Sequence, residues 1–197
     1  MNIGIYTIHA CNNFGALLQA YATARFLKDN GYDAEIVNLM TIRDEKMMHY
    51  RYPCTNIKNI IFNIYAFLNP QIYKKIVNFN KFRKLLPLSK RYYSKEEIKN
   101  TPPKYDLHIA GSDQIWNMEN ENKEPFYFLS FLPSSYHRIS FASSFGNVEA
   151  AKKNKDIIKK ALSFFDYRSV REQDAAEFLT KECQLQTSCV LDPTFLL

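Results

Sequence analysis

The chain has 197 residues, 46% of them hydrophobic, so it can bury one substantial core within one or two domains. No apolar run approaches the roughly 20 residues that span a bilayer, and the first residues lack the basic start and the cleavage site of a signal peptide. We therefore expect a cytoplasmic protein. The cysteines are irregularly spaced without a CxxC pair, which argues against a disulfide framework and against a metal site. They are Cys11, Cys54, Cys183 and Cys189.

The net charge of +6 is unevenly distributed along the chain. The segment from Lys46 to Lys95 holds eleven Lys or Arg residues and no Asp or Glu, so the other 15 of the 26 basic residues accompany all 20 acidic ones. One segment therefore carries the whole positive excess, and the rest of the chain is net acidic. Because no known nucleic-acid-binding module is recognisable either, we expect no nucleic-acid partner.

The N-terminal segment predicts a β-α-β unit. Ile3–Ile8 is a short apolar run rich in β-branched residues, which is typical of a strand. Apolar residues then recur at helical spacing from Gly15 to Asn30, and Gly31 follows where a helix commonly ends. Ala34–Leu39 is a second strand-like run. Such a unit places two parallel strands on either side of a right-handed crossover.

Residues from about 41 to 100 have the pattern of a basic helical insert. Large apolar residues are mixed with Lys and Arg at roughly helical spacing over 56–68 and 70–86, and Pro53, Pro70 and Pro87 interrupt the pattern. This predicts two or three amphipathic helices. Two interpretations remain open. The helices could form a lid whose cations face water, or they could meet an anionic membrane surface or a lipid-linked phosphate at the inner face of the membrane.

The alternation of strands and helices resumes after the insert. We predict four further strands, at 105–111, 138–143, 167–171 and 188–192, with helical segments near 148–165 and 172–181. Strands that alternate with helices indicate an α/β fold, here a Rossmann-like, doubly wound parallel sheet in one domain over residues 1–197.

Ligands of an open parallel sheet bind beyond the carboxyl ends of its strands, so the residues after each strand are candidates for a site. After the first strand, Asn13 and Gly15 open the first helix, where free N–H groups can hold a phosphate or carboxylate. A single glycine at such a turn can equally serve backbone geometry alone. His9 could act as an acid, donate a hydrogen bond or simply pack.

The segment Gly111–Asn117 (GSDQIWN) combines a glycine, four polar side chains and the only tryptophan directly after an apolar strand. Its polar groups form either an internal network or a ligand-binding wall, unless they only cap the start of a helix. Later strand ends add Ser144, Gly146, Arg171 and Asp192. Arg171 can hold a carboxylate or phosphate in a bidentate pair, or can pair with a neighbouring acid.

The chain resembles the polysaccharide pyruvyl transferase family in five segments, whose order and approximate spacing match. They are Asn13–Tyr21 (NFGALLQAY), Gly111–Asn117 (GSDQIWN), Ser140–Gly146 (SFASSFG), Ser169–Glu172 (SVRE) and Leu191–Leu197 (LDPTFLL). The GSDQIWN segment is the most specific. The resemblance implies a fold similar to the GT-B glycosyltransferases, in which two Rossmann-like halves face a cleft, with this chain as the N-terminal half.

The resemblance also implies a reaction. Members transfer a pyruvyl group from phosphoenolpyruvate, the donor substrate, to a sugar of a surface polysaccharide or a lipid-linked oligosaccharide precursor, and no further cofactor is expected. Such chemistry needs an acid, a base, and cationic or N–H groups for the phosphate and carboxylate of the donor. We predict that Asp113 activates the sugar hydroxyl. The predicted substrate-binding residues are Asn13, Gly15, Ser112, Gln114, Asn117, Ser144, Gly146 and Arg171.

The chain departs from the family in one respect. Members are commonly nearly twice as long, and their second half carries an Arg-x-His segment that is thought to engage the donor. None of the four histidines, His9, His49, His108 and His137, lies in such a segment. We therefore expect the acceptor-side half of the enzyme, with the C-terminal GT-B-like half missing or supplied by a separate chain. Two alternatives remain open: a GT-B glycosyltransferase that uses a nucleotide-sugar, and an inert fragment that binds saccharide or a partner.

Overall fold

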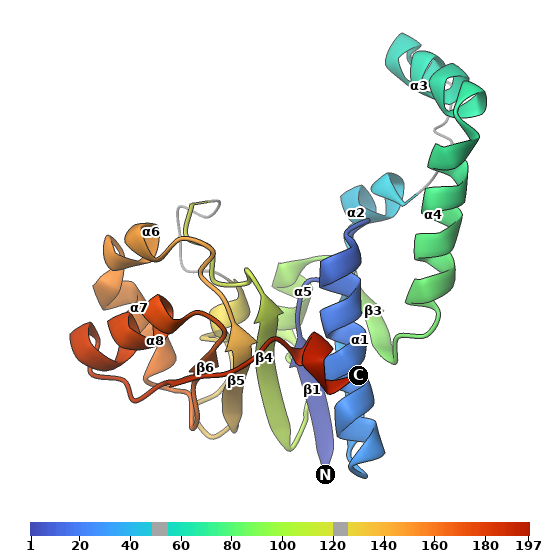
Figure 1. The fold of residues 1–197 in the computed structure, drawn as a ribbon. Coiled ribbons are helices and arrows are strands. Elements are labelled where there is room, and N and C mark those ends of the chain that lie inside the picture. The colour runs from blue at the N-terminus through green and yellow to red at the C-terminus, as the bar shows by residue number, and fades with distance from the viewer. Residues whose placement is uncertain (49–54, 120–125) are drawn as a thin grey trace.

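The computed structural model describes residues 1–48, 55–119 and 126–197, so that His49 and Cys54 lie outside the described ranges. Within these ranges the strands form one seven-stranded sheet in the order β3-β2-β1-β4-β5-β6-β7, and all of them pair in parallel (Figure 1). The strands are β1 (Asn2–Tyr6), β2 (Asp33–Leu39), β3 (Leu88–Tyr92), β4 (Leu107–Asp113), β5 (Arg138–Ser143), β6 (Ser169–Val170) and β7 (Ser188–Cys189). The predicted α/β Rossmann-like class is confirmed.

Helices connect these strands. The α-helices of the described residues are α1 (Phe14–Asp29), α2 (Ile42–Met47), α3 (Ile57–Leu68), α4 (Pro70–Arg83), α5 (Lys95–Asn100), α6 (Val148–Lys152), α7 (Lys155–Leu162) and α8 (Gln173–Glu177). A π-helical turn, Phe178–Glu182, follows α8, and 3-10 turns lie at Phe126–Phe128 and Pro193–Leu196. The last of these turns packs against α1, which brings the C-terminal residues back to the first helix (Figure 1).

The first β-α-β unit forms as the sequence predicts. Asn13 caps α1, and its side-chain oxygen accepts an N–H of the first turn at 3.1 Å. At the other end Gly31 has a φ of 82°, and the N–H groups of Gly31 and its successor return to the carbonyls of Lys28 and Leu27. This is the Schellman arrangement, and it explains why the helix ends at this glycine.

The sheet has an apolar core on each face, because successive strand residues point to opposite sides. In β2, Ile36 packs in the cluster beside α1 and Val37 in the larger cluster on the other face; Ile109 and Ala110 of β4 divide in the same way. Trp116, 0% exposed, lies in the larger cluster. Because both faces are covered, the middle of each central strand is largely apolar, and this made these strands recognisable in the sequence.

The segment 41–100 contains the expected helices and also one strand of the main sheet. α3 lies far from the sheet, and α4 runs from α3 toward the sheet (Figure 1). The chain then returns as β3, which pairs with β2 at the edge of the sheet, and continues into α5. The sequence did not reveal this strand, because its residues (LSKRY) are apolar only at the two ends and charged at Lys90 and Arg91, as is common in edge strands.

The C-terminal elements are shorter than predicted. Only Ser169–Val170 and Ser188–Cys189 pair as strands, and the predicted helix at 148–165 is divided into α6 and α7. The strands end there, and farther along the two segments the side chains of Arg171 and Asp192 form an ion pair.

Candidate functional site

The order of the sheet reverses between the neighbouring strands β1 and β4, and their ends therefore flank the crevice where an open α/β sheet binds ligands. Gln19 of α1, 2% exposed, joins the two strand ends. Its Nε2 donates to the Thr7 hydroxyl at 2.8 Å and to the Ala16 carbonyl at 2.7 Å, and its Oε1 accepts the N–H of Ser112 at 3.2 Å. Thr7 also donates to the Ser112 carbonyl at 3.2 Å. The end of β1 and the GSDQIWN segment are thus one hydrogen-bonded unit.

Asp113, the last residue of β4, is half-buried and has a φ of 75°. Its Oδ1 accepts the N–H of Gln114 at 2.8 Å, whereas its Oδ2 has no hydrogen-bond partner among the described residues. Two residues earlier, Gly111 has a φ of 147°, and a Cβ at that position would lie 2.0 Å from the Phe141 carbonyl oxygen. Only glycine therefore lets β4 approach β5 closely enough to present Asp113 at this edge.

The loop after β5 is held against the loop after β4. Ser144 donates its N–H to the Asp113 carbonyl at 3.0 Å, and its own carbonyl accepts the N–H of Trp116 at 3.1 Å. The hydroxyl of Ser144 accepts the N–H of Gly146 at 2.9 Å, and the side chain is fully buried. Ser144 therefore builds the loop and does not face a ligand.

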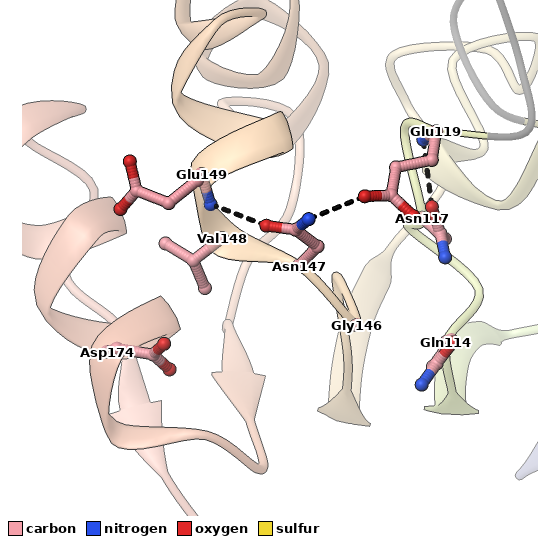
Figure 2. A pocket seen from close by; sticks show the side chains of 8 residues that line it. All are labelled: Gln114, Asn117, Glu119, Gly146, Asn147, Val148, Glu149 and Asp174. Atoms are coloured by element: carbon pink, nitrogen blue, oxygen red, sulfur yellow. Dashed lines mark hydrogen bonds between the residues drawn. The ribbon is translucent and has the colours of Figure 1, made fainter.

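An open pocket of about 520 Å³ lies between these two loops and the helices α6 and α8. Figure 2 shows Gln114 and Asn117 on one side of it, and Glu149 of α6 with Asp174 of α8 on the other. The other lining residues are Glu119, Gly146, Asn147 and Val148. The wall thus carries three carboxylates and three amide side chains, and no Lys or Arg lines it among the described residues.

Hydrogen-bond acceptors dominate the wall of this pocket. Asn147 bridges its two sides, because its amide donates to the Glu119 carboxylate and its oxygen accepts the N–H of Glu149 at 3.0 Å (Figure 2). Gly146 has a φ of 69°, and a Cβ there would lie 2.8 Å from the Gln114 amide carbon. Carboxylate and amide oxygens accept hydrogen bonds from hydroxyl groups, whereas a wall without cations disfavours a phosphate. The pocket therefore suits a molecule rich in hydroxyls.

A second polar cluster joins the ends of β4, β6 and β7. Arg171 donates from Nη1 to Asp192 Oδ2 at 3.1 Å and from Nε to Glu172 Oε1 at 3.0 Å, and the Ser112 hydroxyl donates to the same Asp192 oxygen at 3.3 Å. Burial alone would raise the pKa of Asp192, but the hydrogen bonds from Thr194 and Arg171 outweigh it and lower that pKa. Of the two interpretations of Arg171, the structure shows the internal ion pair.

His9 is 2% exposed and packs inside the end of β1. Its ring nitrogens lie 3.2 Å from the Thr7 carbonyl and 3.2 Å from the Asn38 side-chain oxygen, and burial lowers its pKa. His9 is thus packed in the interior, and because both neighbouring oxygens are acceptors, its ring N–H donates a hydrogen bond within the protein.

Arg83, the last residue of α4, reaches the same loop after β1. Its Nη2 donates to the Cys11 carbonyl at 2.6 Å and to the Asn12 side-chain oxygen at 2.5 Å. Burial raises the pKa of the Cys11 thiol, which keeps the thiol protonated. Sequence reasoning missed Arg83, because it is one of eleven cations in the basic segment and nothing in its spacing distinguishes it.

A comparison with protein families gives the family of the chain. The family model described as polysaccharide pyruvyl transferase matches residues 13–197, from the cap of α1 to the last residue of the chain. The chain belongs to this family. No curated protein and no solved structure matches it significantly. Among the described residues, no helix has the length and apolarity to cross a bilayer, and no three His, Cys, Asp or Glu side chains are grouped so that they could hold a metal ion.

In this polysaccharide pyruvyl transferase family member, the residues predicted from sequence fall into three groups. The first group lines the pocket and consists of Gln114, Asn117 and Gly146. The second lies outside the pocket lining but is at least partly exposed: Asn13 and Gly15 at the start of α1, and Asp113, half-buried, at the end of β4. The third belongs to the internal framework and consists of Ser112, Ser144 and Arg171.

The lining residues Glu119, Asn147, Glu149 and Asp174 were missed. Glu149 and Asp174 lie in the first turns of the helices that follow β5 and β6. An acidic first turn directly after a strand end is the signal that could have pointed to them.

Proposed function

We propose that this chain supplies the sugar-binding side of a pyruvyl transferase, which moves a pyruvyl group from phosphoenolpyruvate to two hydroxyls of a surface polysaccharide or its precursor. Family membership supports the reaction class. The observation that carries the assignment to the sugar side is the pocket of Figure 2, whose wall has three carboxylates, three amides and no cation among the described residues.

The charge of the pocket wall favours the sugar acceptor over the phosphoenolpyruvate donor. Phosphoenolpyruvate carries a phosphate and a carboxylate, so the carboxylates of Glu119, Glu149 and Asp174 would repel it. A neutral sugar unit carries no such charge, and its hydroxyls can donate to the same oxygens. The volume of about 520 Å³ is within the range of small-molecule sites and admits a saccharide unit. The pocket is therefore proposed for the acceptor, with the donor bound elsewhere.

The proposed chemistry proceeds in two additions to one carbon. Protonation of the enol CH₂ carbon of phosphoenolpyruvate makes its neighbour oxocarbenium-like, and a sugar hydroxyl attacks that neighbour while a base removes the hydroxyl proton. The bond from that carbon to the phosphate oxygen then breaks, a second hydroxyl bonds to the same carbon and loses its proton, and phosphate leaves carrying that proton. We assign the base to Asp113, because its Oδ2 has no partner among the described residues and the next residue, Gln114, lines the pocket.

Saccharide binding tests the pocket. A panel of mono- and disaccharides is screened against the chain by saturation-transfer NMR, and binding is compared with that of a Glu149→Gln/Asp174→Asn variant. Because hydrogen bonds to charged groups contribute about 1.5–3 kcal/mol each, the variant should bind at least tenfold more weakly. The matched control is Asp156→Asn/Glu182→Gln, which removes two exposed carboxylates away from the pocket. Equal binding by all three proteins would contradict the pocket assignment.

Donor consumption tests the reaction. The protein is incubated with the saccharide panel and either phosphoenolpyruvate or nucleotide-sugars. We expect release of phosphate from phosphoenolpyruvate that depends on the acceptor, and Asp113→Asn should lower that rate by about 10²-fold or more while saccharide binding persists. An unchanged rate would exclude Asp113 as the base. Consumption of a nucleotide-sugar instead would identify a glycosyltransferase. If neither donor were consumed and no saccharide were bound, the chain would be inert.

A further inference from the structure

α3 exposes an apolar face that no described part of the chain covers. Ile57, Ile61, Ile64 and Leu68 are 74%, 62%, 55% and 70% exposed and follow one another at intervals of three or four residues. Such spacing places side chains on one side of a helix. The same face is widened by three further exposed side chains, Ile60, Tyr65 and Phe67. The buried residue of α3 is Ala66, so the helix turns its small side chain inward and its large apolar side chains toward water.

The position of α3 shows that its apolar side chains are not part of either core of the protein. α3 lies at the outer end of α4, away from the sheet and from both of its apolar cores (Figure 1). α3 and α4 together are called the arm below. A contiguous exposed apolar face of this kind marks an interaction surface, whereas single exposed apolar residues need no explanation.

The charge of the arm indicates what the apolar face meets. No acidic residue occurs between Lys46 and Lys95, and the exposed lysines of the arm and its inner end are Lys58, Lys74, Lys75, Lys81 and Lys84. If two copies met through their arms, these like charges would come together and repel. An anionic surface neutralises them instead. Aromatic residues such as Tyr65 and Tyr73, both exposed, are also favoured at the boundary between lipid and water.

We propose that the arm binds an anionic phospholipid bilayer. α3 has 12 residues and is therefore about 18 Å long, so it lies along the bilayer surface, with its apolar face among the acyl chains and the lysines at the headgroups. The inner end of α4 carries Arg83, which is hydrogen-bonded to the loop after β1. The arm thus ties a membrane surface to the candidate site. This inference does not depend on the proposed reaction.

Co-sedimentation with vesicles tests the electrostatic part. The chain should bind vesicles of phosphatidylcholine mixed with phosphatidylglycerol, should bind phosphatidylcholine alone far more weakly, and should dissociate as salt is added. Lys74→Gln/Lys81→Gln/Lys84→Gln should lower the affinity by more than tenfold, because each lysine near an anionic surface contributes about fivefold. The control removes the same charge elsewhere, by Lys28→Gln/Lys153→Gln/Lys160→Gln, and should keep the affinity.

A second pair of variants tests the apolar part. Ile61→Ser/Ile64→Ser should lower vesicle binding by at least tenfold. The control Ile157→Ser/Tyr167→Ser also removes two exposed apolar side chains, but on the body of the protein, and should bind like the unchanged chain. Urea unfolding of each variant verifies that the fold is retained; because the substituted side chains are exposed, we expect unchanged midpoints.

Three outcomes would overturn the proposal. Equal binding to neutral and anionic vesicles would remove the role of the lysines, and arm variants that bind as well as the unchanged chain would remove the role of the arm. A dimer in solution that Ile61→Ser/Ile64→Ser dissociates, with no vesicle binding, would show that the apolar face serves a second copy of the chain.

Discussion

Replacing Gln19 by methionine should destabilise the protein, although the new side chain fills nearly the same space. Gln19 is 2% exposed, and its side chain makes four hydrogen bonds, at 2.7 Å to Ala16, 2.8 Å to Thr7, 3.2 Å to Ser112 and 3.4 Å to Ile8. Methionine is flexible and apolar, so it can occupy the site without opening a cavity. The substitution therefore isolates the hydrogen bonds that join the ends of β1 and β4.

The magnitude follows from these contacts. A buried hydrogen bond contributes about 1 kcal/mol net, and a buried group left without a partner costs roughly 1–3 kcal/mol. Thr7 keeps its bond to the Ser112 carbonyl, but the N–H of Ser112 loses its acceptor. We expect a loss of about 2–4 kcal/mol in the free energy of unfolding, which for a chain of this size corresponds to a fall in Tm of roughly 4–16 °C.

Urea unfolding measures this loss. Trp116, the only tryptophan, is fully buried, so its fluorescence reports the transition directly. The matched control is Gln114→Met, which changes an exposed glutamine and should shift the free energy of unfolding by no more than about 0.5 kcal/mol. If Gln19→Met lost no more than that control, the hydrogen bonds of Gln19 would not be what holds the two strand ends together.

Two further predictions concern the framework. Gly111→Ala should prevent folding to soluble protein, because its Cβ would lie 2.0 Å from the Phe141 carbonyl oxygen. The control Gly31→Ala, at a φ of 82° with nothing within 4 Å, should fold and lose only about 1 kcal/mol in the free energy of unfolding. Circular dichroism and the yield of soluble protein distinguish the two variants. His108 is buried and has its pKa lowered to about 4, chiefly by burial and also by Arg138, so the unfolded chain binds the proton first as pH falls below about 6.5. The stability present above that pH should then fall by up to about 3 kcal/mol toward pH 4, and His108→Gln should flatten this dependence in urea unfolding at pH 7 and pH 5.

The central fold could be predicted because the apolar pattern of its strands and the residues that follow them both indicate a parallel α/β sheet. β1, β4 and β5 are apolar runs that end in polar, glycine-containing segments, and both faces of the sheet are covered. β3 gave no such signal, since an edge strand needs only one neighbour and tolerates Lys90 and Arg91. The strands β6 and β7 were predicted too long, because an apolar pattern does not show at which residue strand pairing stops.

The candidate site was predictable in position but only partly in membership. The rule that ligands bind beyond strand ends led to Gln114, Asn117 and Gly146, which line the pocket. The same rule selected Ser112 and Arg171, whose hydrogen bonds go to Asp192. The sequence does not show whether a polar side chain faces a ligand or has a partner inside the protein when that partner is distant in the chain. Asp192, the partner of Ser112, lies 80 residues away from it.

The residues of the framework and the carboxylates of the pocket lie in different parts of the sequence, and this bears on the choice of acceptor sugar. Gln19, Ser112, Arg171 and Asp192 all lie in the five segments that resemble the family, and their hydrogen bonds hold the strand ends in place. The three carboxylates of the pocket, Glu119, Glu149 and Asp174, lie outside those segments and are exposed. Since exposed side chains can change at little cost in stability, the wall of the pocket can be altered without disturbing the joint between β1 and β4. We therefore expect differences in the choice of acceptor sugar to depend on those three carboxylates and the loops that carry them, while Gln114 and Asn117 line the pocket from within a family segment.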